Sequence, residues 1–440
     1  MKKFAGVAIL LLLVPFSLFG QEEPEVALDS VEKRAVIDAV CAHLEREYIF
    51  PDVTGRYVRL LRQNLESGTY DTIEDPSEFA RAVTDDLESI HRDRHLSVRF
   101  DPDWVRGERG REELDQEAIE RREWRNRTRN YGFREIEILD GNIGYLRLDS
   151  FSYDEDAYAV AIGAMSVLAN ADALIIDLRA NGGGSPEMVQ FLCSYLLENP
   201  RKHLNSFTYR DEAKLTQYWT YTYLPGQRLV EADVWVLTSE NTFSAAEEFA
   251  YNLKHLDRAV IVGETTGGGA HDNKFVILTD RFMMSLPFAR AVNPITQKNW
   301  EEIGVEPDVK VDRDLALETA LAMASEHLAE MENPPHIKAF HEWYHETYEA
   351  TLHPVTLDEV TSRSFVGTYG PRKITLEDGS LIYQREERPK MKMIPMSDDR
   401  FMFDESKNFR IRFIKEKDRV VAIEGMNPGG ATDRHEKNDP

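Results

Sequence analysis

The sequence predicts an α/β protein with a helical region before the α/β core and a small all-β module after it. Apolar residues recur at spacings of three and four within residues 24–95, which is typical of packed helices. Within residues 131–330, apolar strands alternate with amphipathic helices, as in a buried sheet covered by helices. Residues 356–428 carry short strands and no convincing helix, which indicates a separate β module.

The first segment of the chain, MKKFAGVAILLLLVPFSLFG, has the hydropathy of a membrane-inserting sequence. Two lysines precede an apolar run from Phe4, and small residues precede the acidic QEEPE. This order predicts a secretory signal peptide at residues 1–20, with an uncleaved membrane anchor as the alternative. We therefore expect an exported protein, periplasmic or extracellular.

Charge and cysteine content exclude some classes of function. The 440 residues carry a formal net charge of −25 at pH 7, so bulk electrostatics disfavour binding to nucleic acid or an anionic membrane. The two cysteines, Cys41 and Cys193, lie in apolar helical patterns. We expect both to be buried as small hydrophobic side chains, without a disulfide framework.

The helical region is expected to contain helices at residues 31–48 and 79–91. HLSVRF, which follows, alternates apolar and polar residues and predicts a half-buried strand. Residues 96–130 are predicted to be a charged connector. Of the 30 residues from 101 to 130, 17 are charged with nearly balanced signs, which favours a solvated segment over a binding patch.

The α/β region is expected to begin with a hairpin around Asp140-Gly141, whose sequence is typical of a tight turn. Strands and helices then alternate to about residue 331. The expected strands are 133–139, 142–148, 173–178, 234–238, 259–263, 275–280, 281–287 and 306–311, and the expected helices are 156–170, 185–198, one from Ser244, and 316–331.

Prolines bracket a predicted linker helix within residues 331–355. The β module that follows is expected to include a hairpin around Asp378-Gly379 and to be separable from the core. Residues 429–440, GGATDRHEKNDP, are predicted to be a disordered tail.

The stretch LTSENTFSAAEEFAYNLKHL passes from a strand to a helix at Ser244. Ser244 and Glu247 have the spacing of a capping box, in which hydroxyl and carboxylate bind free N–H groups at a helix start. The alternative is that Ser244 is a nucleophile. That function requires a base, an orienting carboxylate and an oxyanion hole from elsewhere in the chain.

A second strand–helix junction, DLRANGGGS at residues 177–185, contains three consecutive glycines. Such junctions are where α/β proteins bind ligands, and glycines allow backbone N–H groups to face a ligand directly. The run fits neither GxGxxG nor GxxxxGK[ST], which disfavours a nucleotide loop. It could form one wall of an oxyanion hole if a nucleophile lies beside it.

Four segments, LIIDLRANGGG, LTSENTFSAAEEFAYNLK, RAVIVGETTGGGAH and NWEEIGVEPDVKV, together resemble one family in order and spacing. It is the tail-specific or C-terminal-processing family of serine peptidases, in the branch of the tricorn protease core and the interphotoreceptor retinoid-binding protein modules. The resemblance covers about residues 30–325. It implies a crotonase-like ββα spiral at residues 131–330, peptide-bond hydrolysis by Ser244, and no metal or organic cofactor.

The resemblance also implies which side chain activates Ser244. The tail-specific branch uses a lysine, but the matching position here is Gly269. The tricorn-like branch uses a histidine and an orienting glutamate, which His95 in DRHLSV and Glu301 in WEEIGV match. Arg94 stands where the tricorn core has a second serine. A neutral imidazole can accept a hydroxyl proton, and we expect a histidine-like pKa of roughly 6 to 7.

Further site residues follow from the same resemblance. The expected oxyanion-hole residues are Gly182, Gly183 and Ala245. The expected substrate-side residues are Gly268, Gly269 and His271, with a structural role for His271 as the alternative. The retinoid-binding relatives supply a rival function, namely a non-catalytic module that binds an apolar ligand or a peptide in the same cleft.

HEWYH, at residues 341–345, matches the zinc helix HExxH. His341 and His345 would bind the metal with Glu342 as base, and Asp358 or Glu359 could be a third ligand. Chance matches to so short a pattern are frequent, and the helix lies in a connector. We favour a linker helix docked by its aromatic side chains, Phe340, Trp343, Tyr344 and Tyr348.

Overall fold

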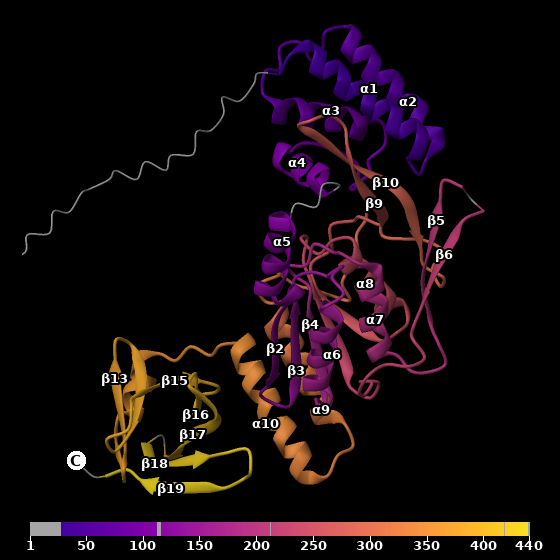
Figure 1. The fold of residues 1–440 in the computed structure, drawn as a ribbon. Coiled ribbons are helices and arrows are strands. Elements are labelled where there is room, and N and C mark those ends of the chain that lie inside the picture. Colours follow the sequence, from indigo (N-terminus) through magenta and orange to yellow (C-terminus); the bar gives the residue numbers. More distant parts are fainter. Residues whose placement is uncertain (1–27, 112–115, 212, 418, 439–440) are drawn as a thin grey trace, which may run out of the picture.

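The computed structural model describes residues 28–111, 116–211, 213–417 and 419–438 (Figure 1). The signal peptide predicted at residues 1–20 lies outside the described residues. Within them, no helix combines the length and the apolar character needed to cross a membrane. Cys41 and Cys193 are free and buried, as predicted.

The N-terminal region is a bundle of three helices. Their bounds are α1 Ser30–Glu47, α2 Pro51–Glu66 and α3 Pro76–Ile90. The side chains of Asp29 and Asp75 accept N–H groups in the first turns of α1 and α3, which fixes where these helices begin. The sequence predicted two of these helices.

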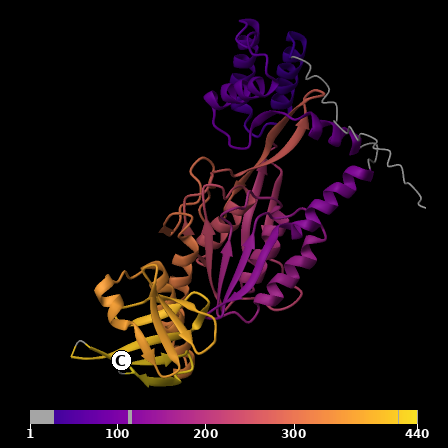
Figure 2. The same ribbon diagram turned by 90° about the vertical axis from the view of Figure 1, so that its left-hand side faces the viewer.

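The core of the bundle is completed by strands from outside it. Antiparallel strands β9 (His271–Ile277) and β10 (Phe282–Val292) rise from the α/β region and reach the helices (Figures 1 and 2). β10 also pairs with β1 (Ser97–Phe100). Phe282 and Leu286 of β10 are buried among the helical side chains. The predicted boundary at residue 95 is therefore crossed by a ribbon from the later part of the chain.

The α/β region contains a six-stranded sheet in the order β11-β8-β7-β4-β3-β2. All neighbours are parallel except the hairpin of β2 and β3. The bounds are β2 Phe133–Leu139, β3 Ile143–Leu148, β4 Ala173–Asp177, β7 Asp233–Thr238, β8 Ala259–Gly263 and β11 Val309–Lys310. The predicted fold class is confirmed.

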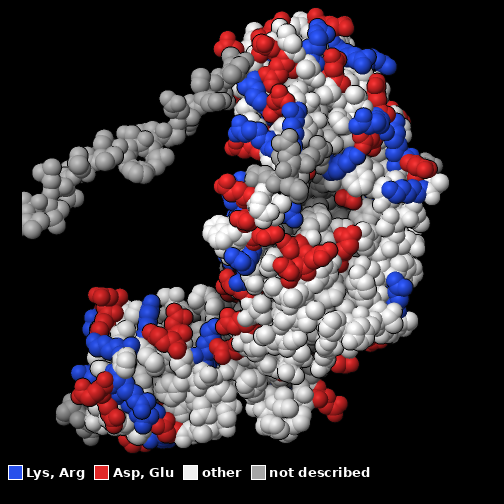
Figure 3. Space-filling view, in the orientation of Figure 1, with Lys and Arg blue, Asp and Glu red and all other residues white. Residues whose placement is uncertain are grey.

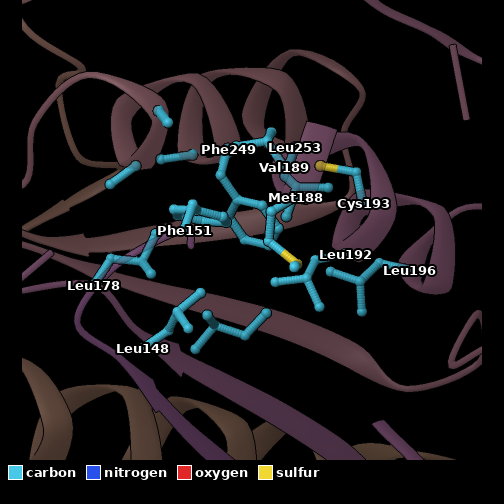
Figure 4. Close-up of a cluster of buried hydrophobic side chains, with 14 of the residues drawn as sticks. Leu148, Phe151, Leu178, Met188, Val189, Leu192, Cys193, Leu196, Phe249 and Leu253 are labelled. Carbon is cyan, nitrogen blue, oxygen red and sulfur yellow. The ribbon is translucent and has the colours of Figure 1, made fainter. Parts of the chain in front are cut away.

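Helices cover both faces of this sheet. The side chains of α6 (Ala157–Leu168), α7 (Pro186–Leu196) and α8 (Ala245–His255) share one apolar cluster with alternate residues of the strands (Figure 4). The other residues of the same strands pack against α9 (Ala316–Glu330). Burial on both faces explains why these strands are continuous apolar runs.

Two strands of the sheet that contains β10 were not predicted from the sequence. They are β5 (His203–Tyr209) and β6 (Leu215–Trp219), which extend the sheet of β10 and β1. No residue of β6 is fully buried, and its sequence LTQYW lacks the continuous apolar run of the core strands. The charged connector contains helices α4 (Pro102–Arg111) and α5 (Gln116–Thr128) and a short turn η1 (Asn130–Gly132).

The C-terminal module is an eight-stranded antiparallel sheet, in sequence order from β12 to β19. A short helix that was not expected, α11 (Glu359–Phe365), precedes it. The strands are β12 Gly367–Tyr369, β13 Arg372–Glu377, β14 Ser380–Arg385, β15 Met391–Pro395, β16 Arg400–Phe403, β17 Ser406–Glu416, β18 Arg419–Met426 and β19 Thr432–Glu436. The prediction of a disordered tail at residues 429–440 is wrong for β19, because this strand pairs along β18.

The linker helix is α10 (Pro335–Leu352), which contains HEWYH. Trp343, Tyr344 and Tyr348 are buried against α9 and the sheet, as the aromatic-docking alternative predicted. The Trp343 indole also donates to the Lys407 carbonyl at 2.9 Å, and Arg410 lies 3.8 Å over its ring. α10 thus contacts both the α/β region and the β module.

In Figure 3 charges of both signs are mixed over the helical bundle and the β module.

Candidate active site

Ser244 lies between β7 and α8 in a backbone conformation unusual for a side-chain-bearing residue. Its φ is +54° and its ψ is −121°. Such a conformation is costly, and it persists only where surrounding contacts hold it. The elements of a capping box are present, but the hydroxyl makes no side-chain cap hydrogen bond. The half-buried Ser244 side chain thus keeps the capping-box arrangement with the first turn of α8, but its hydroxyl has no cap hydrogen bond.

Glu247, the other half of the capping box, holds this turn. Its buried carboxylate accepts the N–H of Ser244 at 2.8 Å. It also accepts the N–H of Gly268 at 2.7 Å, the N–H of Gly269 at 2.8 Å and the Thr266 hydroxyl at 2.5 Å. Burial raises the pKa of Glu247 to about 7, and these four donors oppose that rise. One carboxylate thus joins the Ser244 turn to the TTGGG loop.

The glycine loop after β4 packs directly on Ser244. Gly183 has φ +105°, and a Cβ there would lie 2.8 Å from the Ser244 Cβ and 3.1 Å from the Ala245 nitrogen. The Asn181 side chain accepts the Gly183 N–H at 2.8 Å, while the Asn181 carbonyl accepts the Phe243 N–H at 3.0 Å. The predicted loop and nucleophile are therefore neighbours, although the Gly183 N–H already has an acceptor.

His95 reaches the same place from the end of the helical bundle. Its ring is 7% exposed and lies 4.7 Å, centroid to centroid, from the ring of Phe243, the residue before Ser244. A Cβ on Gly269 would lie 2.7 Å from His95 Cε1 and would also collide with the Phe243 ring. A lysine at position 269 and this placement of His95 are therefore incompatible.

Glu301 binds the residue next to His95, but its carboxylate accepts backbone N–H groups and makes no hydrogen bond to the His95 imidazole. Oε1 accepts the Arg94 N–H at 3.1 Å, and Oε2 accepts the Ala270 N–H at 2.6 Å. The same oxygen lies 3.6 Å from His271 Nδ1. His95 Nδ1 has no hydrogen-bond partner among the described residues. Glu301 therefore holds the segment that carries His95.

Comparisons with known proteins identify the domain that carries these residues. Residues 142–311 match the family model described as Peptidase family S41. Residues 30–122 match a second model, described as the N-terminal domain of Peptidase_S41 in eukaryotic IRBP. The chain thus contains a domain of peptidase family S41. This confirms the family expected from the sequence.

Two curated relatives of this S41 chain are each named carboxyl-terminal-processing protease. The one from Picosynechococcus sp. is 27% identical over 39% of this chain and 40% of its own length. The one from Synechocystis sp. is 28% identical over 40% and 39%. The chain thus spans about two fifths of the length of these relatives. Among solved structures, a lipoprotein from Streptococcus agalactiae has a TM-score of 0.47 at 16% identity, covering 72% of this chain and 100% of that one.

Burial shifts the titration of the S41 site. It lowers the pKa of His95 to about 4, and His271 adds to this effect while Asp93 opposes it. This is below the range expected from the sequence. A histidine with so low a pKa is neutral at physiological pH and has a free lone pair, as a general base requires.

The remaining predicted site residues are near Ser244 but face the protein. The N–H groups of Gly268 and Gly269 donate to Glu247 and so are not free to bind a ligand. His271 is 4% exposed, and its Nδ1 lies 3.0 Å from Asp93 Oδ2. His271 thus has the structural surroundings that were the alternative to a substrate contact.

One group of described side chains has the composition of a metal site. Ligand atoms of Asp93, His271 and Glu301 all lie within 4.8 Å of one another. Among the described residues, no such group includes His341 or His345 of HEWYH. His341 instead lies 3.7 Å from the Asp172 carboxylate. The zinc-helix interpretation thus lacks a third ligand in the part of the chain that the structure describes.

Sequence reasoning missed two residues of the S41 site. Asp93 is 1% exposed and accepts the His95 N–H at 3.1 Å. Its place two residues before His95 was the available signal. Glu247 was recognised as a capping residue, but its bonds to the TTGGG loop could not be seen in the sequence, because they join residues about twenty positions apart.

Proposed function

We propose that this protein is a serine endopeptidase in which Ser244 is the nucleophile and His95 the general base. One observation carries the proposal. Ser244 opens α8 at positive φ without a side-chain cap hydrogen bond, the glycine loop packs on it, and His95 contacts the ring of the preceding residue, Phe243. Catalytic serines on sharp strand-to-helix turns have this arrangement.

The chemistry is acyl transfer. The Ser244 hydroxyl attacks the peptide carbonyl carbon while His95 accepts its proton, and His95 then returns the proton to the leaving amine. The developing oxyanion needs backbone N–H donors. The Ala245 N–H, at the first position of α8, has no intrahelical acceptor, and Gly182 is exposed in the loop opposite. We assign these two as the donors. Water then hydrolyses the acyl-enzyme.

Glu301 has a supporting role in this proposal. It binds the Arg94 N–H, next to His95, so its loss should weaken the placement of the base without removing nucleophile or base. Glu301→Gln should lower kcat by roughly tenfold, far less than loss of His95. Steady-state kinetics on a cleaved peptide measure the difference. A Glu301→Gln variant as inactive as His95→Ala would give Glu301 a direct catalytic role.

A fluorophosphonate probe tests the peptidase proposal directly. Wild type should be labelled at Ser244, as mapped by peptide mass spectrometry, and should cleave members of a peptide library. Ser244→Ala and His95→Ala should each abolish both while the protein remains folded, as circular dichroism checks. An intact wild type that neither labels nor cleaves across a broad library would favour a module that binds an apolar ligand or a peptide.

Export is part of the proposal and rests on the sequence of residues 1–20. Two lysines, an apolar run and small residues stand before Gln21. Mass spectrometry of the exported protein should find a mature N-terminus near Gln21. An intact Met1 in the exported fraction would contradict a cleaved signal peptide.

A further inference from the structure

Asp93 is a buried carboxylate that joins three parts of the chain. It is 1% exposed. Its Oδ1 accepts the His95 N–H at 3.1 Å, and its Oδ2 accepts the Tyr48 hydroxyl of the helical bundle at 3.0 Å. The same Oδ2 lies 3.0 Å from Nδ1 of His271, at the start of β9. Among the ion pairs of the described residues, Asp93 has this histidine as its partner and no lysine or arginine.

Glu301 holds the same segment from the opposite direction. Asp93 binds the N–H of His95, and Glu301 binds the N–H of Arg94, one residue earlier. His271 lies between the two carboxylates, 3.0 Å from one and 3.6 Å from the other. The backbone that carries His95 is therefore bound at two consecutive N–H groups by two carboxylates that share one imidazole.

Two buried carboxylates repel each other unless a positive charge lies between them. Asp93 is the chief cause of a raised pKa at His271, with Glu301 adding to it, against the opposing effects of burial and Arg290. The Phe50 ring packs against the same imidazole at 5.2 Å and keeps it from water. His271 is thereby the counter-ion of the pair.

We infer that Asp93 and His271 are positioning residues, which hold the Arg94–His95 backbone so that the His95 imidazole meets Ser244. This inference rests on the proposed function, since it explains how His95 is placed without a carboxylate on its Nδ1. Stacking on Phe243 fixes the ring, and the two carboxylates fix the backbone beneath it. His271 stabilises both carboxylates while it carries a proton.

The inference predicts that activity falls as the pH rises and His271 loses its proton. When His271 loses its proton, the charge between Asp93 and Glu301 disappears and the clamp on residues 94–95 loosens. The charged and titratable groups around His271 are Asp93, Glu301, Arg290 and His95. The Tyr48 hydroxyl reaches it only through Asp93, and the Phe50 ring packs on it. Removing the negative charge of Asp93 should move this alkaline limb to lower pH.

The rate of fluorophosphonate labelling of Ser244, followed against pH, tests the inference. Asp93→Asn and His271→Gln should slow labelling near neutral pH roughly ten- to hundredfold, because small displacements of a catalytic group have effects of this size. The alkaline limb should shift down in Asp93→Asn and vanish in His271→Gln. Tyr48→Phe is the matched control, since it removes one donor to Asp93 but no charge, and it should keep the wild-type limb.

The outcomes separate the two proposals. If wild type labels and both variants keep its rates and both limbs of its pH profile, the positioning inference is overturned while the peptidase stands. If folded wild type does not label, both proposals fall. If circular dichroism shows that a variant does not fold, the test is the labelling rate of the wild type against pH. A wild-type rate that does not fall at alkaline pH overturns the inference.

Discussion

Two serines begin neighbouring helices of the α/β domain, and they differ in backbone conformation and in capping. Ser185 follows β4 and caps α7 with ordinary extended backbone, φ −77° and ψ 125°, and its hydroxyl accepts the Met188 N–H at 3.3 Å. Ser244 follows β7, the parallel neighbour of β4, yet has φ +54° and no side-chain cap hydrogen bond. Similar sequence signals thus produce one hydroxyl that caps its helix and one that makes no cap hydrogen bond.

The difference lies in what surrounds each turn. The Ser185 hydroxyl also donates to Glu187 at 2.7 Å, within its own helix. At Ser244 the corresponding carboxylate, Glu247, binds the backbone of a distant loop, and Gly183 packs on the serine from a third segment. A strained serine needs such external support, at a cost on the order of 1–3 kcal/mol. A capping serine does not.

The largest difference is expected when each serine is replaced by alanine, because one change should affect activity and the other stability. Ser244→Ala should lower kcat/KM by roughly 10⁴-fold or more, because the nucleophile is lost, with little change in the free energy of unfolding. Ser185→Ala should keep most activity but lose about 1 kcal/mol of stability through its cap. Peptide hydrolysis and chemical denaturation measure both. Equal effects at the two positions would remove the distinction.

Gly183→Ala should have the next largest effect. The added Cβ meets the Ser244 Cβ at 2.8 Å in a left-handed conformation, so it pushes on the nucleophile itself. We expect kcat to fall roughly 10²- to 10³-fold, as when an oxyanion hole is disturbed. The adjacent Gly182→Ala should cost far less, because nothing lies within 4 Å of its Cβ position. Similar losses in both variants would contradict this geometry.

Glu247→Gln compares the two carboxylates. An amide at position 247 places N–H hydrogens against the N–H donors of Ser244, Gly268 and Gly269, which should cost about 1–3 kcal/mol of stability and lower kcat. Glu187→Gln, at an exposed side chain, should change stability by less than about 0.5 kcal/mol. Thermal unfolding measures the first effect. A Glu247→Gln protein as stable as wild type would show that the hydrogen bonds of the Glu247 carboxylate are not needed for stability.

The smallest effect is expected in the acidic pH dependence. Because the pKa of His95 falls from 6.5 to about 4 on folding, the unfolded chain binds more protons than the native one in this window. Stability from this group is complete above the unfolded pKa and is lost as pH falls through the window. The acidic limb of kcat/KM should lie near the lower value. A limb at an ordinary histidine pKa, or the same unfolding profile in His95→Gln, would contradict the burial of this ring.

Local signals in the sequence predicted most of the α/β core, because its central strands β3, β4 and β7 are buried on both faces and have continuous apolar sequences. They failed for β6, none of whose residues is fully buried, and for β19, which is a strand only because it pairs along the edge of β18. At the site, the family motifs predicted that Ser244, His95 and Glu301 come together. They could not show that Glu301 binds the Arg94 N–H, or that Asp93 and Glu247 join distant loops, since those contacts depend on tertiary packing.

The long-range assembly of the site has a consequence for the newborn chain. Ribosomes release the helices and Ser244 before the TTGGG loop and the ribbon of β9 and β10, and Glu301 comes later still. Until Gly268 and Gly269 have been made, Glu247 lacks the donors that hold the Ser244 turn, and β1 has no β10 to pair with. We therefore expect that a partly synthesised chain does not hydrolyse nearby proteins. Peptidase activity should appear only when the late segments have been made and the site is complete.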